Sequence, residues 1–522
     1  MTEKFLYKSI KNENNLIVWM GFPGKYSFSL SALGYLWLTK ILEESGDFNV
    51  ERICSDTKNT IYNQPDIFGF SFSFDFDFLE IFKILEKYNI QLKSKDRKDK
   101  HFIFAGGPVV TANPVPYKEI FDFFIIGDGE DINLKALRTI KDNINLSKKE
   151  ILKKLSNIEG VYVPTSSQSS PCKGGGVIED TNRKTVIKHT KRLTECIYTP
   201  VLSEDSFFKN TFIIELERGC TNRCAFCLAS YLNLPLRSVP DNNLFQAIEL
   251  GLKHTNKIAF LGAQVSAHPK FKEICKYIYD KIKNGVNIEM HFSSLRVDSI
   301  DEQVIKTIVA AGQKNITLAI EAGSERLRKL INKNLSNDQL YRAVEICKKN
   351  GLKGIKFYGM IGIPTESNDD IEAIIELAKD LKIKSKGMDI SFGFSTFVPK
   401  PHTPFQWCGR EDTKSLEKKS TYIQKELHKL GIQSSISSAK WDYWQAVLSR
   451  GDDTFTEFLI DIYKNGGKIG AFKSAAKNHN INTDNYALSN YTFDKKLPWD
   501  FIKITPGKSF LVQEYKKLYN GL

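Results

Sequence analysis

Three cysteines, Cys220, Cys224 and Cys227, lie within eight consecutive positions. Thiolates are the natural ligands of iron–sulfur clusters, and three of them can hold three irons of a cubane while the fourth iron stays open to another ligand. Arg218 and Arg223 in the same stretch would favour thiolates and an anionic cluster. A structural zinc site is the alternative, but it usually needs four ligands in paired spacing, and no fourth Cys or His lies nearby in the sequence. The spacing therefore predicts a [4Fe-4S] centre.

The cysteines follow the first of six apolar runs that are separated by helix-length amphipathic stretches. The runs cover residues 212–217, 257–262, 288–293, 316–321, 354–360 and 390–397. Six such βα units are too few for a closed eight-stranded barrel but fit a partial one. The functional face of a barrel is built from the loops after its strands, so the cysteines are expected at that face.

The residues before this series predict a separate domain of the same α/β class. Short apolar runs alternate with helical patterns over residues 16–145, as in an open parallel sheet that is covered on both faces. Ligands bind such sheets outside the carboxyl ends of the strands. The predicted segments are a Rossmann-like domain over 1–160, a linker or hairpin over 161–205, a partial barrel over 206–410 and a mainly helical region over 411–522.

The motif C-x₃-C-x₂-C after a first barrel strand, with Phe226 before the third cysteine, resembles the signature of the radical S-adenosylmethionine (SAM) superfamily. The resemblance implies an enzyme whose open iron chelates the methionine moiety of SAM. It also implies that one electron, from a donor such as flavodoxin or ferredoxin, cleaves SAM to methionine and a 5′-deoxyadenosyl radical. The predicted partial barrel agrees with the fold of that superfamily.

The same resemblance implies SAM contacts at the ends of the later strands, although a plain βα-turn role is the alternative for each residue alone. Glu321 is expected to accept hydrogen bonds from ribose hydroxyls, and Arg326 to pair with the SAM carboxylate. The superfamily usually has an acidic residue just after Gly262, and this sequence has none there. The candidates are Gly262, Ala263, Gln264, Ser293, Arg296, Glu321 and Arg326, with residues 359–366 lining the adenine.

Two glycine-rich strand ends make the N-terminal domain a candidate cofactor site. Small residues at such places let the backbone approach a flat or anionic ligand closely. Tight turns in an ordinary α/β domain are the alternative. The candidates are Gly106, Gly107 and Asn113 at one strand end, and Gly127, Gly129 and Glu130 at the next.

These segments resemble the radical SAM proteins with a cobalamin-binding domain, in particular a branch whose domain is cobalamin-binding-like. The resemblance includes residues 397–407 and 448–452, which would be placed to close over the substrate. The element D-x-H-x-x-G, which supplies a histidine ligand to cobalamin, is replaced by residues 21–26, and His101 begins a strand instead of ending one. Either cobalamin binds without a histidine ligand, with Tyr26 or no protein ligand, or the domain has lost the cofactor.

Composition argues against secreted and membrane proteins. The first fifteen residues are polar and charged, and no apolar run approaches the roughly 20 residues of a membrane span, so a cytoplasmic protein is expected. Nine cysteines without a paired framework indicate reduced thiols. The net charge of +13 could attract nucleic acid, but the excess is spread over 522 residues and is typical of a lysine-rich surface.

The interpretation that combines these features is a radical SAM methyltransferase, assisted by cobalamin, with an unknown substrate. A tRNA-modifying methylthiotransferase-like enzyme is the first alternative, which the basic charge favours weakly. That family has three further cysteines in its N-terminal domain for a second cluster, whereas only Cys54 precedes the linker here. A non-catalytic sensor or assembly factor with a structural cluster is the second alternative, against which the SAM-side segments argue.

Overall fold

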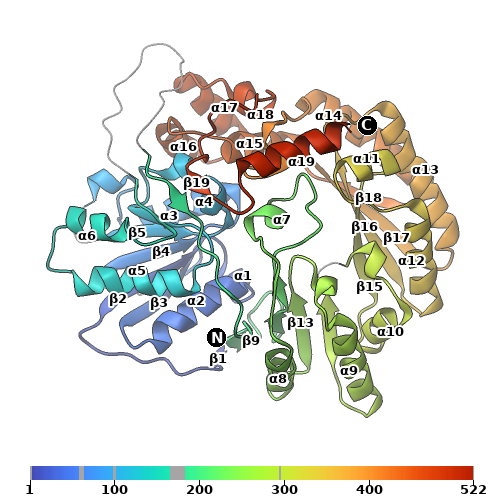
Figure 1. Ribbon diagram of the computed structural model, residues 1–522, viewed down its shortest axis with the longest axis horizontal. Helices are drawn as coiled ribbons and strands as arrows, with labels where there is room; N and C mark the ends of the chain where they lie inside the picture. Colours follow the sequence, from blue (N-terminus) through green and yellow to red (C-terminus); the bar gives the residue numbers. More distant parts are fainter. Residues whose placement is uncertain (1–2, 58–63, 98–100, 165–182, 293–294, 521–522) are drawn as a thin grey trace.

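The computed structural model describes residues 3–57, 64–97, 101–164, 183–292 and 295–520. Figure 1 shows an N-terminal sheet on the left, a curved row of barrel strands and helices on the right, and C-terminal helices above them. The predicted fold class is confirmed: a parallel N-terminal sheet is followed by a partial barrel and a mainly helical C-terminal region.

Within the described residues, the N-terminal sheet has six strands in the order β3–β2–β4–β5–β6–β7. All neighbours are parallel except β6 and β7. The order reverses between β2 and β4, and doubly wound sheets bind ligands outside the carboxyl ends of strands at such a point. The strands are β2 (Leu16–Phe22), β3 (Phe48–Cys54), β4 (Ile67–Ser71), β5 (Phe102–Gly106), β6 (Phe123–Ile125) and β7 (Val161–Tyr162).

Helices from two distant parts of the chain cover this sheet. Three N-terminal helices pack on one face. On the other face, four longer helices, one N-terminal and three C-terminal, share a core with Phe68 and Phe124. The C-terminal region therefore completes the core of the N-terminal domain. The first group is α2 (Leu33–Glu44), α5 (Glu130–Asp142) and α6 (Lys148–Leu155); the second is α3 (Phe78–Lys87), α15 (Ala439–Ser449), α16 (Phe455–Lys464) and α17 (Ile469–Asn478).

The barrel has seven parallel strands in the part of the chain that the structure describes, arranged in two sheets. A parallel bridge between Leu295 and Leu318 joins the sheets. The sequence predicts six of the strands; the barrel extends past the expected boundary at residue 410 because β18 pairs with β17. The strands are β10 (Phe212–Glu215), β13 (Lys257–Leu261), β14 (Glu289–Phe292), β15 (Asn315–Glu321), β16 (Gly354–Ile361), β17 (Asp389–Thr396) and β18 (Gln433–Ile436).

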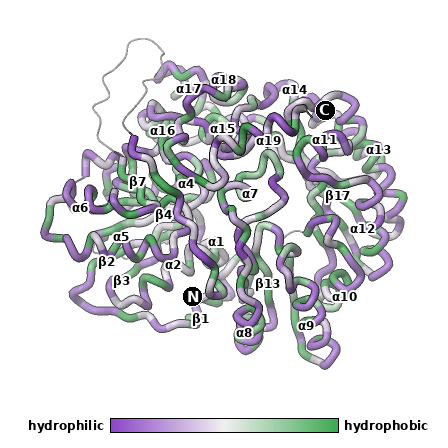
Figure 2. The backbone as a smooth tube through the Cα atoms, viewed as in Figure 1, coloured by the Kyte–Doolittle hydropathy of each residue, from purple (hydrophilic) through white to green (hydrophobic). Residues whose placement is uncertain are grey.

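Helices on the outside of the barrel bury one face of each strand. On β15, Ile316, Leu318 and Ile320 are buried in the main core, so the alternate residues, Glu321 among them, face the barrel interior. Figure 2 shows hydrophobic residues along strands such as β17 and hydrophilic ones on the peripheral helices. The helices are α8 (Asp241–Leu252), α9 (Phe271–Lys283), α10 (Glu302–Ala310), α12 (Asn337–Lys349), α13 (Asn368–Lys384) and α14 (Thr413–Lys429).

A buried carboxylate joins the three parts of the molecule. Asp75, in the 3₁₀ turn after β4, accepts hydrogen bonds from Lys400 at 2.6 Å, Ser449 at 2.7 Å and Gln445 at 2.9 Å. Lys400 follows β17, and the other two donors belong to α15. Burial by itself would raise the pKa of Asp75, but the Lys400 charge and these hydrogen bonds outweigh it and hold the pKa below its usual value.

The chain crosses back to the barrel after α17. A short strand, β19 (Ile502–Lys503), pairs with β8 (Val186–Ile187) of the linker. The helix α19 (Lys508–Asn520) then runs above α7 (Leu228–Leu232) toward α11 (Glu325–Leu330), as Figure 1 shows. Among the described residues, none of the helices has the length and apolar character needed to cross a membrane.

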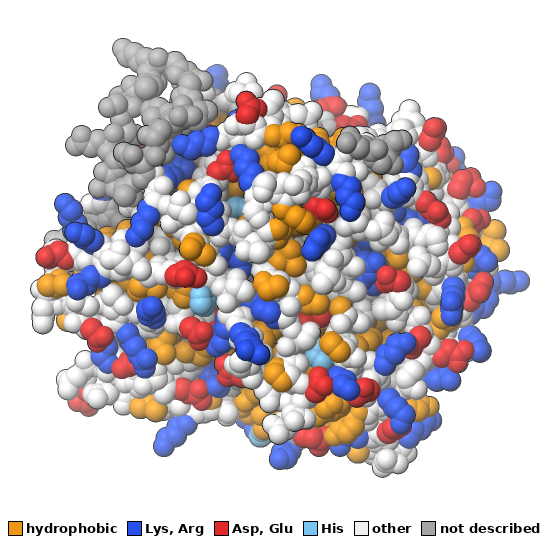
Figure 3. Space-filling view, in the orientation of Figure 1, with side chains coloured by type: hydrophobic (Ala, Val, Ile, Leu, Met, Phe, Trp, Pro, Cys, Tyr) orange, Lys and Arg blue, Asp and Glu red, His pale blue; other side chains and the backbone are white. Residues whose placement is uncertain are grey.

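Charged side chains of both signs are spread over the surface. Figure 3 shows Lys and Arg side chains interspersed with Asp and Glu across one face of the molecule. On this face the positive net charge of the chain is therefore distributed and does not form a single basic patch.

Candidate functional site

The three cysteines lie on residues 219–227, which we call the cluster loop, between β11 (Glu217–Arg218) and α7. The turn after α11 holds this loop by hydrogen bonds. The Asn332 side-chain amide donates to the Asn222 carbonyl over 2.9 Å, and the Ala225 N–H donates to the Ile331 carbonyl over 3.0 Å. The positions of the cysteines are therefore fixed by protein contacts, as a site with preset ligands requires.

The helix α19 covers the outer side of the cluster loop. The guanidinium of Arg223 lies 5.1 Å from the ring centre of Phe510. Tyr515 and Tyr519, further along α19, pack in the same hydrophobic cluster as Phe226. The helix α19 therefore contacts the loop at Arg223 and shares a hydrophobic cluster with Phe226, which precedes the third cysteine.

The thiol groups are withdrawn from solvent and interact electrostatically. Cys220 and Cys224 are buried, and Cys227 is half-buried. Burial raises the pKa of Cys224 to about 12, the positive charge of Lys333 opposes this rise, and the neighbouring cysteines reinforce it. Burial also raises the pKa of Cys227. Thiolates at these places need cationic partners, and iron would supply them, so the donor set fits a cluster.

The arrangement of the donors also bears on the kind of metal centre. No three His, Cys, Asp or Glu side chains of the described residues are grouped around a single metal position. A structural zinc ion requires such convergence, usually of four ligands. In a cubane, by contrast, each thiolate binds a different iron. The assignment of the three thiols to a cluster therefore rests on their spacing in the sequence.

Charged side chains from later strands surround the thiols. Glu321 ends β15 with a φ of 67°, a left-handed conformation that is rare outside glycine and often marks functional sites. Its carboxylate pairs with Lys333 at 3.0 Å. Arg296 binds Asp298 at 2.9 Å, and its charge interacts with Cys224 and the nearby Cys220. The sequence predicts Glu321 and Arg296 but not Lys333, which no motif distinguishes from its lysine neighbours.

The loop after β13, which contains the predicted SAM contacts Gly262, Ala263 and Gln264, lies beside the first cysteine. The Gln264 side-chain oxygen is 3.5 Å from the Cys220 sulfur and also accepts a hydrogen bond from the Asn222 amide. The backbone N–H of Gln264 donates to the Glu217 carboxylate over 2.9 Å. The loop after β13 is therefore hydrogen-bonded both to β11 and to the cluster loop.

Arg326, a predicted SAM contact, is engaged by a neighbouring carboxylate. It pairs with Asp370 at the start of α13 and donates to the Thr365 carbonyl over 3.0 Å. Asp370 is buried and is stabilised by this cation. The contact between Arg326 and the SAM carboxylate stays a prediction. Ser293, another predicted contact, lies outside the described residues.

Asn113 and Glu130, the two residues predicted to make polar contacts to cobalamin, lie where the N-terminal domain contacts other parts of the chain. Asn113 donates to the carbonyl oxygens of Ser449 and Gly451 at 3.2 Å and 2.8 Å. Glu130 pairs with Arg218, the residue before the cluster loop, at 2.7 Å. Both side chains are buried and connect the N-terminal domain to other parts of the chain. A contact between either of them and a corrin stays a prediction.

The glycines of the same strand ends approach protein atoms. Gly107 has a φ of 120°, and a Cβ there would come within 2.6 Å of the Phe72 carbonyl oxygen. Gly127 has a φ of 109°, and a Cβ would come within 2.1 Å of the His189 carbonyl oxygen. These two positions require glycine because of backbone contacts within the chain. Corrin contacts of Gly106, Gly107, Gly127 and Gly129 likewise stay predictions.

The two side chains considered as axial ligands have protein partners. The Tyr26 hydroxyl donates to Glu3, and burial together with this carboxylate raises the pKa of Tyr26 far above its usual value. Tyr26 is therefore a neutral phenol engaged by Glu3. His101 precedes β5 and has its Nδ1 within 2.7 Å of the Pro65 carbonyl oxygen, at the amino end of the sheet.

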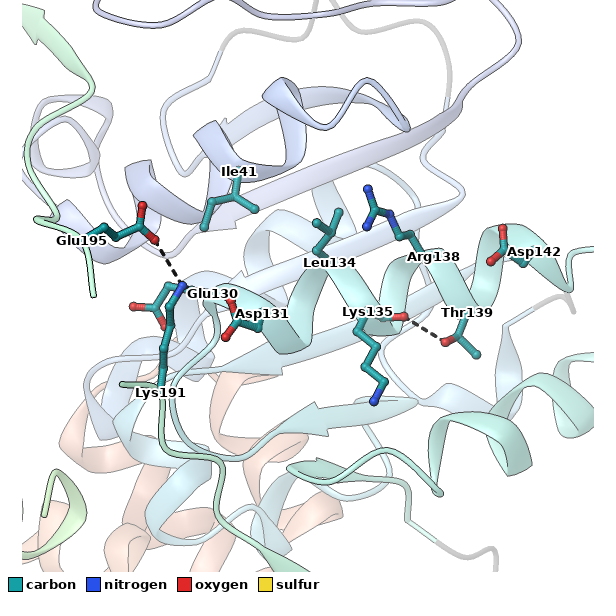
Figure 4. Close-up of a pocket in the computed structure, with 10 residues that line it drawn as sticks. All are labelled: Ile41, Glu130, Asp131, Leu134, Lys135, Arg138, Thr139, Asp142, Lys191 and Glu195. Carbon is teal, nitrogen blue, oxygen red and sulfur yellow. Dashed lines mark hydrogen bonds and ion pairs between the residues drawn. The ribbon is translucent and has the colours of Figure 1, made fainter. Parts of the chain in front are cut away.

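A cavity of about 520 Å³ lies on the outer side of the N-terminal domain, along α5. Figure 4 shows its charged lining, in which Lys191 of the linker points toward Glu195. Lys191 also pairs with Asp131 at 3.0 Å. None of the cluster-loop residues lines this cavity, so it is separate from the thiols.

Two protein families match the chain. The family described as radical SAM proteins, N-terminal, matches residues 38–164, and the radical SAM superfamily matches residues 214–378. The uncharacterized protein MJ0966 of Methanocaldococcus jannaschii is 31% identical and aligns with 88% of this chain and 93% of its own. Threonylcarbamoyladenosine tRNA methylthiotransferase MtaB of Aquifex aeolicus is 23% identical over 49% of this chain and 62% of its own.

Two solved structures share the fold at low sequence identity. The cobalamin-dependent SAM radical enzyme OxsB, with aqua-cobalamin and SAM bound, has a TM-score of 0.56 at 14% identity and covers 90% of this chain and 71% of its own. The radical SAM methyltransferase TsrM from Kitasatospora setae, with cobalamin and a [4Fe-4S] cluster bound, has a TM-score of 0.52 at 14% identity and covers 75% of this chain and 74% of its own.

Proposed function

This chain belongs to the radical SAM superfamily, and from that premise we propose that it cleaves SAM at a [4Fe-4S] cluster held by Cys220, Cys224 and Cys227 and transfers a methyl group with the help of a corrinoid. The observation that carries the proposal is the cluster loop. Its three thiols are withdrawn from solvent, fixed by the turn after α11 and flanked by Lys333 and Arg296.

The residues around the loop have distinct tasks in this proposal. When bound, the cluster supplies the electron that cleaves SAM to methionine and a 5′-deoxyadenosyl radical. Lys333 and Arg296 offset the negative charge of the ligand thiolates, as nearby cations do for reactive cysteines. Glu321 faces the barrel interior next to Lys333 and accepts hydrogen bonds from the SAM ribose. Radical SAM enzymes need a reductant, and we propose a small electron carrier such as flavodoxin or ferredoxin.

Replacing Glu321 by glutamine is expected to weaken SAM binding at least about tenfold, because a hydrogen bond to a charged group is worth about 1.5–3 kcal/mol. Iron content should stay near that of the wild type, since Glu321 is not a cluster ligand in this proposal. The measurement is equilibrium dialysis of SAM with the reconstituted protein under anaerobic conditions.

The matched comparison is Arg326→Ala. In the wild type, the Arg326 guanidinium pairs with Asp370. The alanine variant should therefore lose stability but keep its affinity for SAM. If Arg326→Ala lost SAM affinity while Glu321→Gln kept it, the contact predicted from the sequence for Arg326 would be right, and Glu321 would not be a SAM-binding residue.

The corrinoid part of the proposal is supported by the shape of the N-terminal domain. Its parallel strands reverse order between β2 and β4, which is where such sheets bind cofactors. OxsB and TsrM, which share the fold, hold cobalamin. Because no D-x-H-x-x-G element is present in the sequence, the corrinoid would bind without a histidine from this domain.

Anaerobic reconstitution with iron, sulfide, hydroxocobalamin and SAM is expected to give a protein that retains corrinoid through gel filtration and forms 5′-deoxyadenosine when reduced. His101→Ala should leave the corrinoid absorption spectrum unchanged, because His101 lies at the amino end of the sheet. A protein that carries its cluster and cleaves SAM but never retains corrinoid would have a cofactor-free N-terminal domain, and methyl transfer through a corrinoid would be excluded.

Similarity to a tRNA methylthiotransferase supports a second candidate, methylthio transfer to tRNA. Likeness to that family implies a second cluster held by three N-terminal cysteines. The described part of the N-terminal domain contains only Cys54, which is buried and whose pKa burial raises to about 11. Iron analysis of the reconstituted protein distinguishes the candidates, because a second [4Fe-4S] cluster would double the iron content.

A further inference from the structure

The inner face of the barrel carries a lysine without a carboxylate partner. On β16, Ile355 and Phe357 are buried in the main core, so the alternate residues Lys356 and Tyr358 face the barrel interior. Within the described residues, no ion pair and no hydrogen bond includes the Lys356 ammonium. It lies 4.9 Å from the ring centre of Tyr358. The charge of Lys356 is therefore available to an anion that is not part of the chain.

Two hydroxyl groups flank Lys356 on the neighbouring strands. Lys356 is paired in register with Thr317 of β15 and with Ser391 of β17. Neighbouring strands lie about 4.8 Å apart, so the three side chains form one row across the inner face. Neither hydroxyl makes a side-chain hydrogen bond with another described residue. The row offers one positive charge and two hydroxyl donors, a combination that suits a carboxylate or a phosphate.

The next row toward the carboxyl ends of the strands carries an exposed aromatic ring. Tyr358 is paired in register with two small residues, Ala319 of β15 and Gly393 of β17. A Cβ at Gly393 would come within 2.8 Å of the Tyr358 ring, so the ring lies over the backbone of β17. Tyr358 is 44% exposed although it faces the interior. Complete barrels fill their interior with packed side chains, so an exposed ring here provides a contact surface for a bound molecule.

Both rows lie on the amino-terminal side of the place proposed for SAM. Glu321 is paired in register with Gly359, three residues after Lys356 on β16. At a rise of about 3.3 Å per residue, the backbone of Lys356 is about 10 Å from that level along the strand. An anion at Lys356 and a reacting carbon at the level of Glu321 would thus be separated by the length of a small molecule, with Tyr358 between them.

We propose that Lys356, together with Thr317 and Ser391, binds a carboxylate or phosphate group of the substrate, and that Tyr358 contacts the apolar part of the same molecule. This inference rests on the proposed function, because the substrate has to reach the radical formed from SAM. In β15, β16 and β17, all of which the structure describes, Lys356 is the only cation. One ammonium matches one anionic group, so the substrate class is a small organic acid or a phosphate monoester and not a polyanionic strand.

The test uses three probes that share a phenyl ring, with the full-length reconstituted protein in the presence of SAM. Phenylacetate and phenyl phosphate are anionic, and phenylacetamide is neutral. Binding is measured by ligand-detected NMR titration. In the wild type we expect the anions to bind more tightly than phenylacetamide, and the tighter of the two anions identifies the substrate group as a carboxylate or a phosphate.

Three variants assign the effect to the lysine. Lys356→Met keeps the stem of the side chain and removes its charge, so it should weaken binding of the anions about tenfold or more and leave phenylacetamide unaffected. Lys356→Arg keeps the charge and should keep the preference for anions. Lys379→Met, at an exposed position of α13, is the matched control and should bind all three probes like the wild type.

A wild-type protein that bound phenylacetamide as tightly as the anions, or that bound neither anion, would overturn the inference without reference to any variant. So would a Lys356→Met protein that bound the anions like the wild type. If the preference for anions depended on Lys356 but the wild type formed no 5′-deoxyadenosine from SAM when reduced, the anion site would stand and the proposed function would be contradicted.

Discussion

Alanine at Cys220, Cys224 or Cys227 is expected to abolish the brown cluster chromophore and all SAM cleavage. Each thiolate binds its own iron of the cubane, so loss of one leaves two protein ligands for a cluster that needs three. The loop itself should survive, because its hydrogen bonds to the turn after α11 run through backbone atoms of Asn222 and Ala225. Iron and sulfide analysis, the visible absorption spectrum and 5′-deoxyadenosine formation are the measurements.

Two other cysteines are the matched controls. Cys275 in α9 and Cys347 in α12 are completely buried in the barrel core, where cysteine acts as a small hydrophobic residue. Their alanine variants should keep the cluster and the activity, with only a modest loss of stability. The assignment of the ligands would be wrong if Cys347→Ala lost the cluster while Cys224→Ala kept it.

Replacing Asp75 by alanine is expected to lower the free energy of unfolding by about 3–5 kcal/mol, because removal of one partner leaves the Lys400 ammonium without its counter-charge in a buried place. The same change removes the acceptor for Ser449 and Gln445. Since native proteins are stable by only about 5–15 kcal/mol, the variant should show a large drop in the urea midpoint.

The double variant Asp75→Ala with Lys400→Met separates charge from packing. Removing both partners of a buried ion pair is often nearly neutral, so the double variant should regain much of the lost stability. The ion pair also has a defined pH dependence. The pKa of Asp75 is lowered in the folded protein, so its contribution is present above about pH 4, the unfolded value, and is lost as the pH falls through the folded pKa. A single variant as stable as wild type would contradict this account.

Strands with strong periodicity could be predicted from the sequence. The run at 48–54 is the strand β3, and the run at 316–321 lies within β15. The strand β18 could not be predicted because Gln433–Ile436 carries mostly polar residues and pairs at the edge of its sheet, where none of its residues is fully buried. The sequence also does not predict that α15, α16 and α17 cover the N-terminal sheet. Amphipathicity shows that a helix packs on a core, but it does not show which part of the chain provides that core.

The candidate site likewise contains residues that the sequence indicates and residues that only the fold identifies. The cysteines could be identified because their spacing is itself the signal. Glu321 is a candidate because of its place after a strand. Lys333 could not be predicted, because what distinguishes it is its closeness to Cys224 in the fold. Arg326 was assigned to a ligand because the sequence does not show that Asp370 occupies its guanidinium.

The contact between α19 and the cluster loop has a consequence for the order of events during synthesis. The loop at residues 219–227 leaves the ribosome about 280 residues before Lys508–Asn520, a delay of roughly 15–60 s at ordinary translation rates. Throughout this interval Arg223 lacks the Phe510 ring that later packs on it. Iron and sulfide that reach the chain in this interval would therefore meet a loop that α19 does not yet contact.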